Sequence, residues 1–211
     1  MLIKKNLIIL VIFASINVQG DIIDRFEVLV KKYLTSPETL MSNFKQTILG
    51  EQGKVIDEMS GSIMIQKPNK LRWHYKKPYE QILIRNDNRF ISYDVDLDSY
   101  IIRDVDTLKL NALKVLLNND QKLLSEIEYL DVYEKNGILW AHLLYLGQSN
   151  ESFKFTLGFQ DNALSKMLIK DSLGQNMVID FTDLILNPDI NSTLFDIDRL
   201  IESLSKNISK S

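Results

Sequence analysis

The sequence contains no cysteine, and only four prolines, eight glycines and two histidines among its 211 residues. The lack of cysteine excludes disulfides, thiolate catalysis and an acylated cysteine that would tether the chain to a membrane. Two histidines leave little material for a metal site or a catalytic base. The chain also lacks a strong charge of one sign, because 25 basic and 28 acidic residues give a formal net charge of -3. This balance does not favour nucleic acid as a partner.

Apolar residues make up 45% of the sequence, but no apolar run is long enough to cross a membrane as a helix. One shorter run, Leu7–Phe13, follows Lys4 and Lys5. A basic start followed by a short apolar run is typical of a secretory signal peptide. We therefore predict a signal peptide over residues 1–20 and a single exported domain over residues 21–211, with a hydrophobic core of its own.

Helical spacing of apolar residues predicts two helices between Asp21 and Leu49, separated by Ser36-Pro37. Their apolar stripes are Ile22, Phe26, Leu29 and Tyr33 in the first helix, and Leu40, Phe44 and Ile48 in the second. The pattern predicts another helix over residues 107–124 and a last one near residues 199–205. Such stripes suit a helix packed on a core and a lid helix equally well.

Elsewhere the apolar residues alternate with polar ones, which predicts strands joined by tight turns. The expected strands include segments at residues 62–66, 71–76, 81–85, 89–93, 129–134, 138–146, 152–159, 164–171 and 176–186, and a short last strand at Leu194–Asp196. About eleven consecutive antiparallel strands predict a mainly β (α+β) fold, an incomplete antiparallel β-barrel with helices on its concave side. Strands that are apolar on both faces fit either a lined cavity or a sheet covered by helices.

Motifs for bond chemistry are missing from the sequence. His74 and His142 lie in predicted strands, and no second histidine stands at metal-ligand spacing from either. The carboxylates of Asp94, Asp96 and Asp98 resemble the start of a calcium loop, but the glycine and the final glutamate of such a loop are absent. We interpret them as a turn between strands. No catalytic residue, metal site or cofactor is predicted.

Several short segments together resemble the LolA family of periplasmic outer-membrane lipoprotein carriers. These segments are Phe44–Thr47, Gln66–Tyr75, Lys77-Pro78, Phe90–Asp94 and Asp96-Leu97. The resemblance is most specific between residues 44 and 98, and the order of the later elements extends it over nearly all of the predicted domain. In this family the Phe-x-Gln motif stands at the end of a helix. Here the motif is Phe44-Lys45-Gln46, which falls in the second of the two helices predicted between Asp21 and Leu49.

The resemblance implies an incomplete barrel whose hydrophobic cavity lies under a helical lid. It also implies the function of a periplasmic chaperone. Such a carrier takes triacylated lipoproteins from the inner-membrane ATP-binding cassette complex LolCDE and delivers them to the outer-membrane receptor LolB. LolB shares the fold but needs an acylated cysteine, so the soluble carrier is the better match. We expect a monomer that performs no catalysis, needs no cofactor and does not insert stably into the membrane.

Residues of the expected site follow from the same resemblance. The eight residues expected in the acyl-chain cavity or its lid are Leu40, Phe44, Leu71, Trp73, Phe90, Leu113, Leu116 and Leu117, although each also suits an ordinary core. The family's lid-holding arginine falls on Lys67, which offers a point charge in place of a planar fork. Lys67 is thus a candidate latch that controls transfer, or else a plain turn residue.

Further departures from the family pattern concern single positions. Leu71 occupies a position that is often aromatic, and Ala112 one that is often proline. The segment Phe195–Asp198 lacks the proline-rich continuation that usually follows the last strand. Two other functions remain open. A lipid-sensing or lipoprotein-sensing domain of the same fold would need a further interaction domain, which we do not expect here. A secreted lipid-modifying enzyme would need a nucleophile or a metal site.

Overall fold

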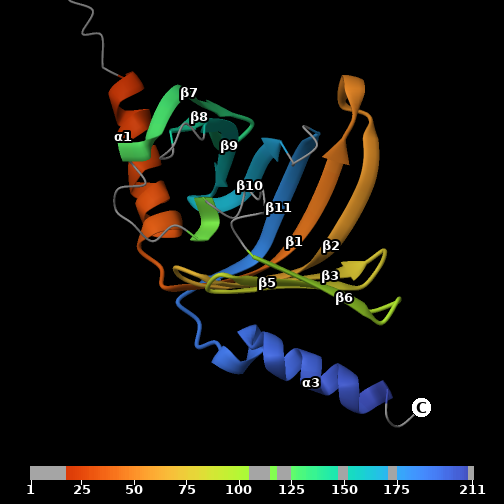
Figure 1. Ribbon diagram of the computed structural model, residues 1–211. Helices are drawn as coiled ribbons and strands as arrows, with labels where there is room; N and C mark the ends of the chain where they lie inside the picture. Colours follow the sequence, from red (N-terminus) through yellow and green to blue (C-terminus); the bar gives the residue numbers. More distant parts are fainter. Residues whose placement is uncertain (1–17, 105–114, 118–124, 147–151, 171–174, 209–211) are drawn as a thin grey trace, which may run out of the picture.

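The computed structural model describes residues 18–104, 115–117, 125–146, 152–170 and 175–208 (Figure 1). Its helical elements are α1 (Val18–Val30), the π-helical turn η1 (Lys31–Thr35), the 3-10 turns η2 (Glu51–Gly53) and η6 (Ser192–Phe195), and α3 (Ile197–Ile208). Within these described ranges, no helix combines the length and the apolar character that crossing a bilayer requires. The predicted domain start at Asp21 falls in the first turn of α1.

Eleven strands form one antiparallel sheet, which confirms the predicted fold class. They are β1 (Thr39–Leu49), β2 (Val55–Gln66), β3 (Lys70–Lys77), β4 (Gln81–Asn86), β5 (Arg89–Asp94), β6 (Ser99–Asp104), β7 (Ile127–Lys135), β8 (Ile138–Leu146), β9 (Ser152–Gln160), β10 (Ala163–Lys170) and β11 (Asn176–Leu186). Their order is β6-β5-β4-β3-β2-β1-β11-β10-β9-β8-β7. The first and last strands therefore pair in the middle, whereas β6 and β7 form the two open edges.

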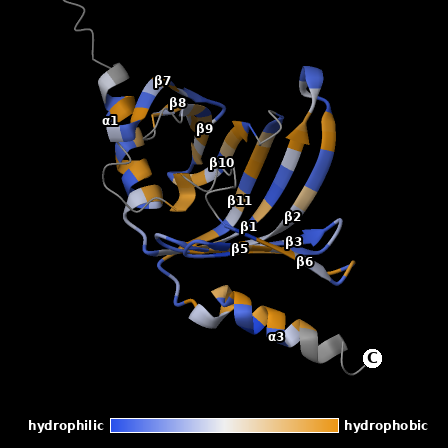
Figure 2. Ribbon diagram, viewed as in Figure 1, coloured by the Kyte–Doolittle hydropathy of each residue, from blue (hydrophilic) through white to orange (hydrophobic). Residues whose placement is uncertain are grey.

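Helices cover both faces of this curved sheet (Figure 1). Helix α1 packs beside β7, and α3 packs beneath the wing formed by β3–β6. The concave face is the one that carries Leu40 and Trp73, and the convex face is the one that α3 covers. Apolar and polar residues both occur along β1 and β2 (Figure 2), and successive side chains point to opposite faces of a strand. Each face of the sheet thus presents its own set of side chains for packing.

The second predicted helix was wrong, because its residues form strand β1. The apolar positions Leu40, Phe44 and Ile48 are four residues apart, which fits a helix and also every second position on one face of a strand. The positions between them carry polar side chains that are nevertheless buried. Ser42 donates a hydrogen bond to the Thr182 carbonyl (2.8 Å), and Gln46 accepts one from the Tyr75 hydroxyl (3.0 Å). These polar residues concealed the alternation.

The predicted short strand at Leu194–Asp196 was also wrong, because residues 192–195 form the 3-10 turn η6. The Asn191 side chain accepts a hydrogen bond from the Thr193 N–H (3.0 Å), which satisfies a free donor at the start of this turn. Asp196 caps α3 in the same manner through the Arg199 N–H (3.0 Å). The C-terminal helix was predicted correctly. The strand count agrees with the prediction because β1 replaces the missing strand.

A separate convex cluster of buried side chains lies between α3 and the sheet. It consists of Ile82, Ile84, Ile91, Tyr93, Phe195, Ile197 and Leu204. Arg89 fastens the helix further, since its guanidinium contacts both carboxylate oxygens of Asp198 at 2.9 Å. Arg72 donates to the Leu194 carbonyl (3.2 Å). The wing β3–β6 therefore packs against a helix of its own.

Gly61 in β2 brings three strands close together. It pairs with Phe44 on one side and with Tyr75 on the other, and the two rings meet edge to face at a centroid distance of 5.4 Å. A Cβ atom at this position would lie 1.8 Å from the carbonyl oxygen of His74. The backbone of β3 would have to move to admit any side chain here.

Replacing this glycine with alanine is therefore expected to destabilise the protein. We predict that Gly61→Ala lowers the free energy of unfolding by about 3 kcal/mol, because the clash is with backbone rather than with a flexible side chain. Urea denaturation followed by circular dichroism measures the change. The neighbouring Ser62→Ala serves as the control, with an expected change within about 0.5 kcal/mol. Equal stability of Gly61→Ala and the wild type would contradict the prediction.

Candidate functional site

The concave face of the sheet carries one continuous group of buried apolar side chains, here called the concave cluster. From the sheet it includes Leu40, Phe44, Ile63, Ile65, Leu71, Trp73, Ile127, Val132, Leu139, Ala141, Leu143, Phe155, Leu157, Phe159, Leu164, Met167, Ile169, Ile179 and Phe181. From the helical segments it includes Phe26, Leu29, Val30, Tyr33, Leu34, Val115, Leu116 and Leu117. These helical segments, namely α1, η1 and residues 115–117, are here called the cover.

Most of the predicted site residues meet in this cluster. Leu40, Phe44, Leu71, Trp73, Leu116 and Leu117 all belong to it. Phe90 is buried too but stands outside both clusters, and Leu113 lies outside the described residues. Of the predicted helix over residues 107–124, the structure describes residues 115–117, which are helical. The geometry thus brings these side chains together, whereas their role in holding acyl chains stays a prediction.

Aromatic contacts join the cover to the sheet. The ring of Phe26 meets those of Tyr129 and Phe159 at centroid distances of 5.7 Å. Tyr33 lies 6.0 Å from Phe159. On the other side of the cluster, Phe44 contacts Trp73 at 5.0 Å. The concave face is therefore closed, with cover side chains packed against it.

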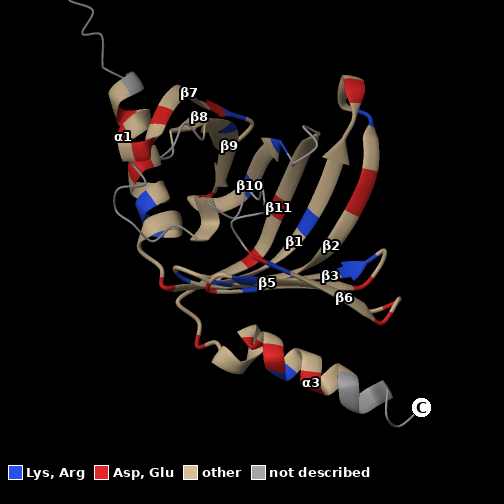
Figure 3. Ribbon diagram, in the orientation of Figure 1, with Lys and Arg blue, Asp and Glu red and all other residues tan. Residues whose placement is uncertain are grey.

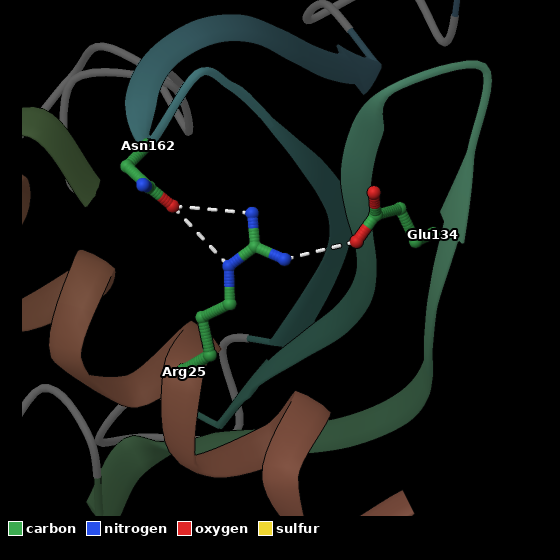
Figure 4. A network of polar contacts seen from close by, with 3 residues as sticks. All are labelled: Arg25, Glu134 and Asn162. Carbon is green, nitrogen blue, oxygen red and sulfur yellow. Dashed lines mark hydrogen bonds and ion pairs between the residues drawn. The ribbon is translucent and has the colours of Figure 1, made fainter. Parts of the chain in front are cut away.

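Polar contacts fix the first half of the cover to one side of the sheet. Arg25 of α1 donates to Glu134 of β7 (2.9 Å) and twice to Asn162 in the turn between β9 and β10 (3.1 and 3.2 Å), as Figure 4 shows. Tyr129 donates to Glu27 (3.3 Å). Burial and the Glu27 carboxylate raise the pKa of Tyr129 to about 12. These contacts could not be predicted from the sequence, because they join residues more than 100 positions apart.

Lys67 holds the other end of the cover. Its ammonium group donates to the backbone carbonyl of Leu34, in the last turn of the α1–η1 segment. Carbonyl groups at the end of a helix lack partners within the helix and carry partial negative charge, which favours a cation there. Burial lowers the pKa of Lys67 from its ordinary value of 10.5 to about 8. The contact lies where the resemblance places a latch.

The two histidines lie on the convex face, away from the concave cluster. His74 contacts Glu80 (2.7 Å), and His142 contacts Thr156 (2.7 Å) and the hydroxyl of Tyr133 (3.2 Å). Within the part of the chain that the structure describes, no group of three histidine, cysteine or acidic residues stands ready to hold a metal ion. These contacts stabilise neighbouring strands.

The other charged residues are interspersed. Residues 95–98 form the turn between β5 and β6, as predicted, and Asp94 accepts a hydrogen bond from the Leu97 N–H (3.0 Å). Basic and acidic residues are interspersed along the described ribbon (Figure 3). Lys45 and Glu58, for example, form an ion pair across β1 and β2 (2.7 Å). The concave cluster, built of apolar side chains, is thus the candidate site.

The described residues thus form an open antiparallel sheet curved around an apolar interior, with helices packed against it. The family model described as "Outer membrane lipoprotein carrier protein LolA" matches residues 35–198. The chain belongs to the LolA family of outer-membrane lipoprotein carrier proteins. This is a family of transport proteins rather than enzymes, in agreement with the prediction.

Individual relatives give the same result. The outer-membrane lipoprotein carrier protein of Methylobacillus flagellatus is 28% identical over 166 residues, which cover 79% of this chain and 81% of that protein. The carrier of Methylococcus capsulatus is 29% identical over 167 residues, with coverages of 79% and 80%. The crystal structure of a LolA superfamily protein from Nitrosomonas europaea superposes with a TM-score of 0.51 at 9% identity, over 85% of this chain and 98% of that one. That likeness concerns the fold.

The lowered pKa of Lys67 makes the stability of the protein depend on pH. Between about pH 8 and 10.5 the unfolded chain binds a proton at this residue that the folded protein has lost, so the free energy of unfolding rises with pH. The difference in stability between the wild type and Lys67→Met should grow in favour of the wild type across this range. Urea titrations at several pH values measure it, and NMR of the Lys67 side chain reports the pKa directly. A constant difference would refute the shift.

Proposed function

We propose that this protein is a periplasmic chaperone that carries acylated lipoproteins between the inner and the outer membrane, with the acyl chains against the concave cluster. The observation that carries the proposal is a continuous apolar face across the centre of the sheet, closed by a cover in which Lys67 holds the Leu34 carbonyl near the end of η1. Membership of the LolA family supports the same function. The relatives named above are themselves outer-membrane lipoprotein carrier proteins.

The energetics of such a cargo explain why a carrier needs this surface. Each buried methylene group is worth about 0.8 kcal/mol, so several acyl chains cannot cross an aqueous compartment unprotected. In the closed protein, the side chains of the cover occupy the concave face. A cargo that displaces them exchanges one apolar contact for another, so the net binding energy is far smaller than the gross burial. A small net energy allows the cargo to be passed on.

The two ends of the cover have different parts in this exchange. Arg25 and Tyr129 tie α1 to the β7 side through three side-chain partners. Lys67 joins the end of η1 to the β2–β3 turn through a single contact. Release of this contact frees the η1 end of the α1–η1 segment from the β2–β3 turn. Re-formation of the contact favours the closed, empty state. Lys67 therefore acts as the latch that drives hand-over.

The partners follow from the family. We expect the protein to collect triacylated lipoproteins from an inner-membrane complex of the LolCDE type and to deliver them to a receptor of the LolB type. The predicted signal peptide at residues 1–20 supports a periplasmic location. The acyl chains that the carrier holds belong to the lipoprotein cargo. We expect the carrier to act as a monomer.

The transport function can be tested with spheroplasts that carry a labelled outer-membrane lipoprotein. Purified protein added to them is expected to release the lipoprotein into the supernatant as a soluble one-to-one complex, which gel filtration detects. A known carrier of the family is the positive control, and buffer alone is the negative one. If the lipoprotein stays in the pellet with this protein while the known carrier releases it, the proposed function is wrong.

The latch can be tested by Lys67→Leu. The variant loses the contact with the Leu34 carbonyl, so the closed state becomes less favourable relative to the loaded one. A hydrogen bond from a charged group contributes about 1.5 to 3 kcal/mol, so hand-over to the receptor should slow by roughly tenfold or more while the fold stays intact. Transfer of labelled lipoprotein from the loaded variant to receptor-containing membranes measures the rate.

Two further variants control this experiment. Lys67→Arg keeps a cation at the latch and should transfer cargo at nearly the wild-type rate. Lys70→Leu makes the same chemical change three residues later, on the convex side, and should leave transfer unchanged. Wild-type transfer by Lys67→Leu would show that no latch operates at this position.

A further inference from the structure

The concave cluster contains one polar atom without a partner. Trp73 is only 4% exposed, and its indole nitrogen Nε1 has no hydrogen-bond partner among the residues described. An unsatisfied buried donor destabilises a folded protein, because it has given up its hydrogen bonds with water. A phenylalanine would supply apolar area here without this penalty. The indole N–H therefore lacks an acceptor among the described residues, and an acceptor on a bound molecule would satisfy it.

The surroundings of Trp73 explain why no acceptor is available. Its cross-strand neighbours are Ile63 in β2 and Leu83 in β4, and neither side chain can accept a hydrogen bond. The rings of Phe44 and Tyr75 pack at 5.0 and 6.0 Å, and aromatic faces are at best weak acceptors. Among these described neighbours, the donor therefore meets apolar and aromatic groups.

Other buried polar groups near this position are satisfied internally. The Tyr75 hydroxyl donates to Gln46 (3.0 Å), and Ser42 donates to the Thr182 carbonyl (2.8 Å). One other buried atom without a partner, Oε1 of Gln66, belongs to a residue that alternation places on the opposite face of the sheet. On the concave face of β1–β3, Trp73 alone among the described residues presents a buried donor that is free.

We propose that Trp73 is a polar anchor within the acyl-chain site and donates its indole N–H to an acyl carbonyl oxygen of the cargo. This inference rests on the proposed carrier function. A hydrocarbon chain has no acceptor, but the ester or amide carbonyl that links each chain to the lipid head does. The anchor fixes the depth at which the chains enter, because it binds the end of the chain that carries the carbonyl. It also favours acyl over alkyl chains.

The inference can be tested with two lipids that differ only in this carbonyl. Dihexadecanoylglycerol has ester linkages, and dihexadecylglycerol has ether linkages with chains of the same length. Binding to the full protein is measured by displacement of a fluorescent apolar dye. The wild type should bind the ester roughly three- to tenfold more tightly, which is the worth of one net hydrogen bond. Trp73→Phe should bind both lipids with the affinity that the wild type has for the ether.

Trp140→Phe is the matched control, because Trp140 is the second of two tryptophans and lies on the convex face. It should keep the preference for the ester. NMR of the wild type gives an independent measurement that requires no variant to fold. Two indole N–H signals are expected, and the one assigned to Trp73 should shift downfield with the ester lipid but not with the ether lipid.

The outcomes separate the two proposals. Equal binding of both lipids by the wild type, with no selective shift of the Trp73 signal, would overturn the anchor and leave the carrier function standing. Binding of neither lipid would count against the carrier function itself, and with it the anchor. Preference for the ester that persists in Trp73→Phe would place the carbonyl contact elsewhere and refute the role of this residue.

Discussion

The concave face of this sheet must be covered at all times, and the rest of the structure follows from that constraint. The concave cluster extends from β3 through β1 and β11 to β7, and exposing it to water would be unfavourable along its whole length. The protein meets the constraint with its own helical cover, and we propose that a loaded carrier meets it with acyl chains. Two interchangeable coverings of similar polarity make capture and release possible without a source of energy in the protein itself.

The strand order suits such an exchange. The first and last strands pair in the middle of the sheet, so the centre of the molecule joins segments from both ends of the domain. The open edges, β6 and β7, come from neighbouring segments of the sequence. A closed barrel would fix the size of its interior, whereas an open sheet can change the distance between its edges without breaking any pairing between strands.

Much of this architecture could be predicted from the sequence. Alternation and the turns between strands identified most of β2–β5 and β7–β11, and the resemblance pointed to Lys67 before its partner was known. The Leu34 carbonyl was not predictable, because a contact with backbone leaves no trace in residue identity. Strand β1 was misinterpreted because Ser42 and Gln46 are buried although they are polar, and only their partners on neighbouring strands make that burial possible. Long-range pairing decides such positions, and periodicity alone does not contain it.

Contacts between residues distant in sequence also limited the prediction of the site. Apolar residues such as Leu71 and Trp73 were found by pattern and resemblance, but the unsatisfied nitrogen of Trp73 became visible only when its neighbours were placed. Arg25 was missed for a similar reason, since Glu134 and Asn162 are distant in sequence. In each case the sequence supplied the correct residue type, and the three-dimensional arrangement supplied the partner.

The convex cluster under α3 has a mechanical consequence. Because β3–β6 pack on this helix through side chains that the concave cluster does not share, the wing keeps this support in the loaded carrier that we propose. Helix α3 thus stabilises the wing from the convex side. In that carrier we expect the strain of admitting a bulky guest to fall on the side of the molecule near β7. The wall that bears Lys67 and Trp73 would then keep its shape and serve as a fixed reference against which the guest is aligned.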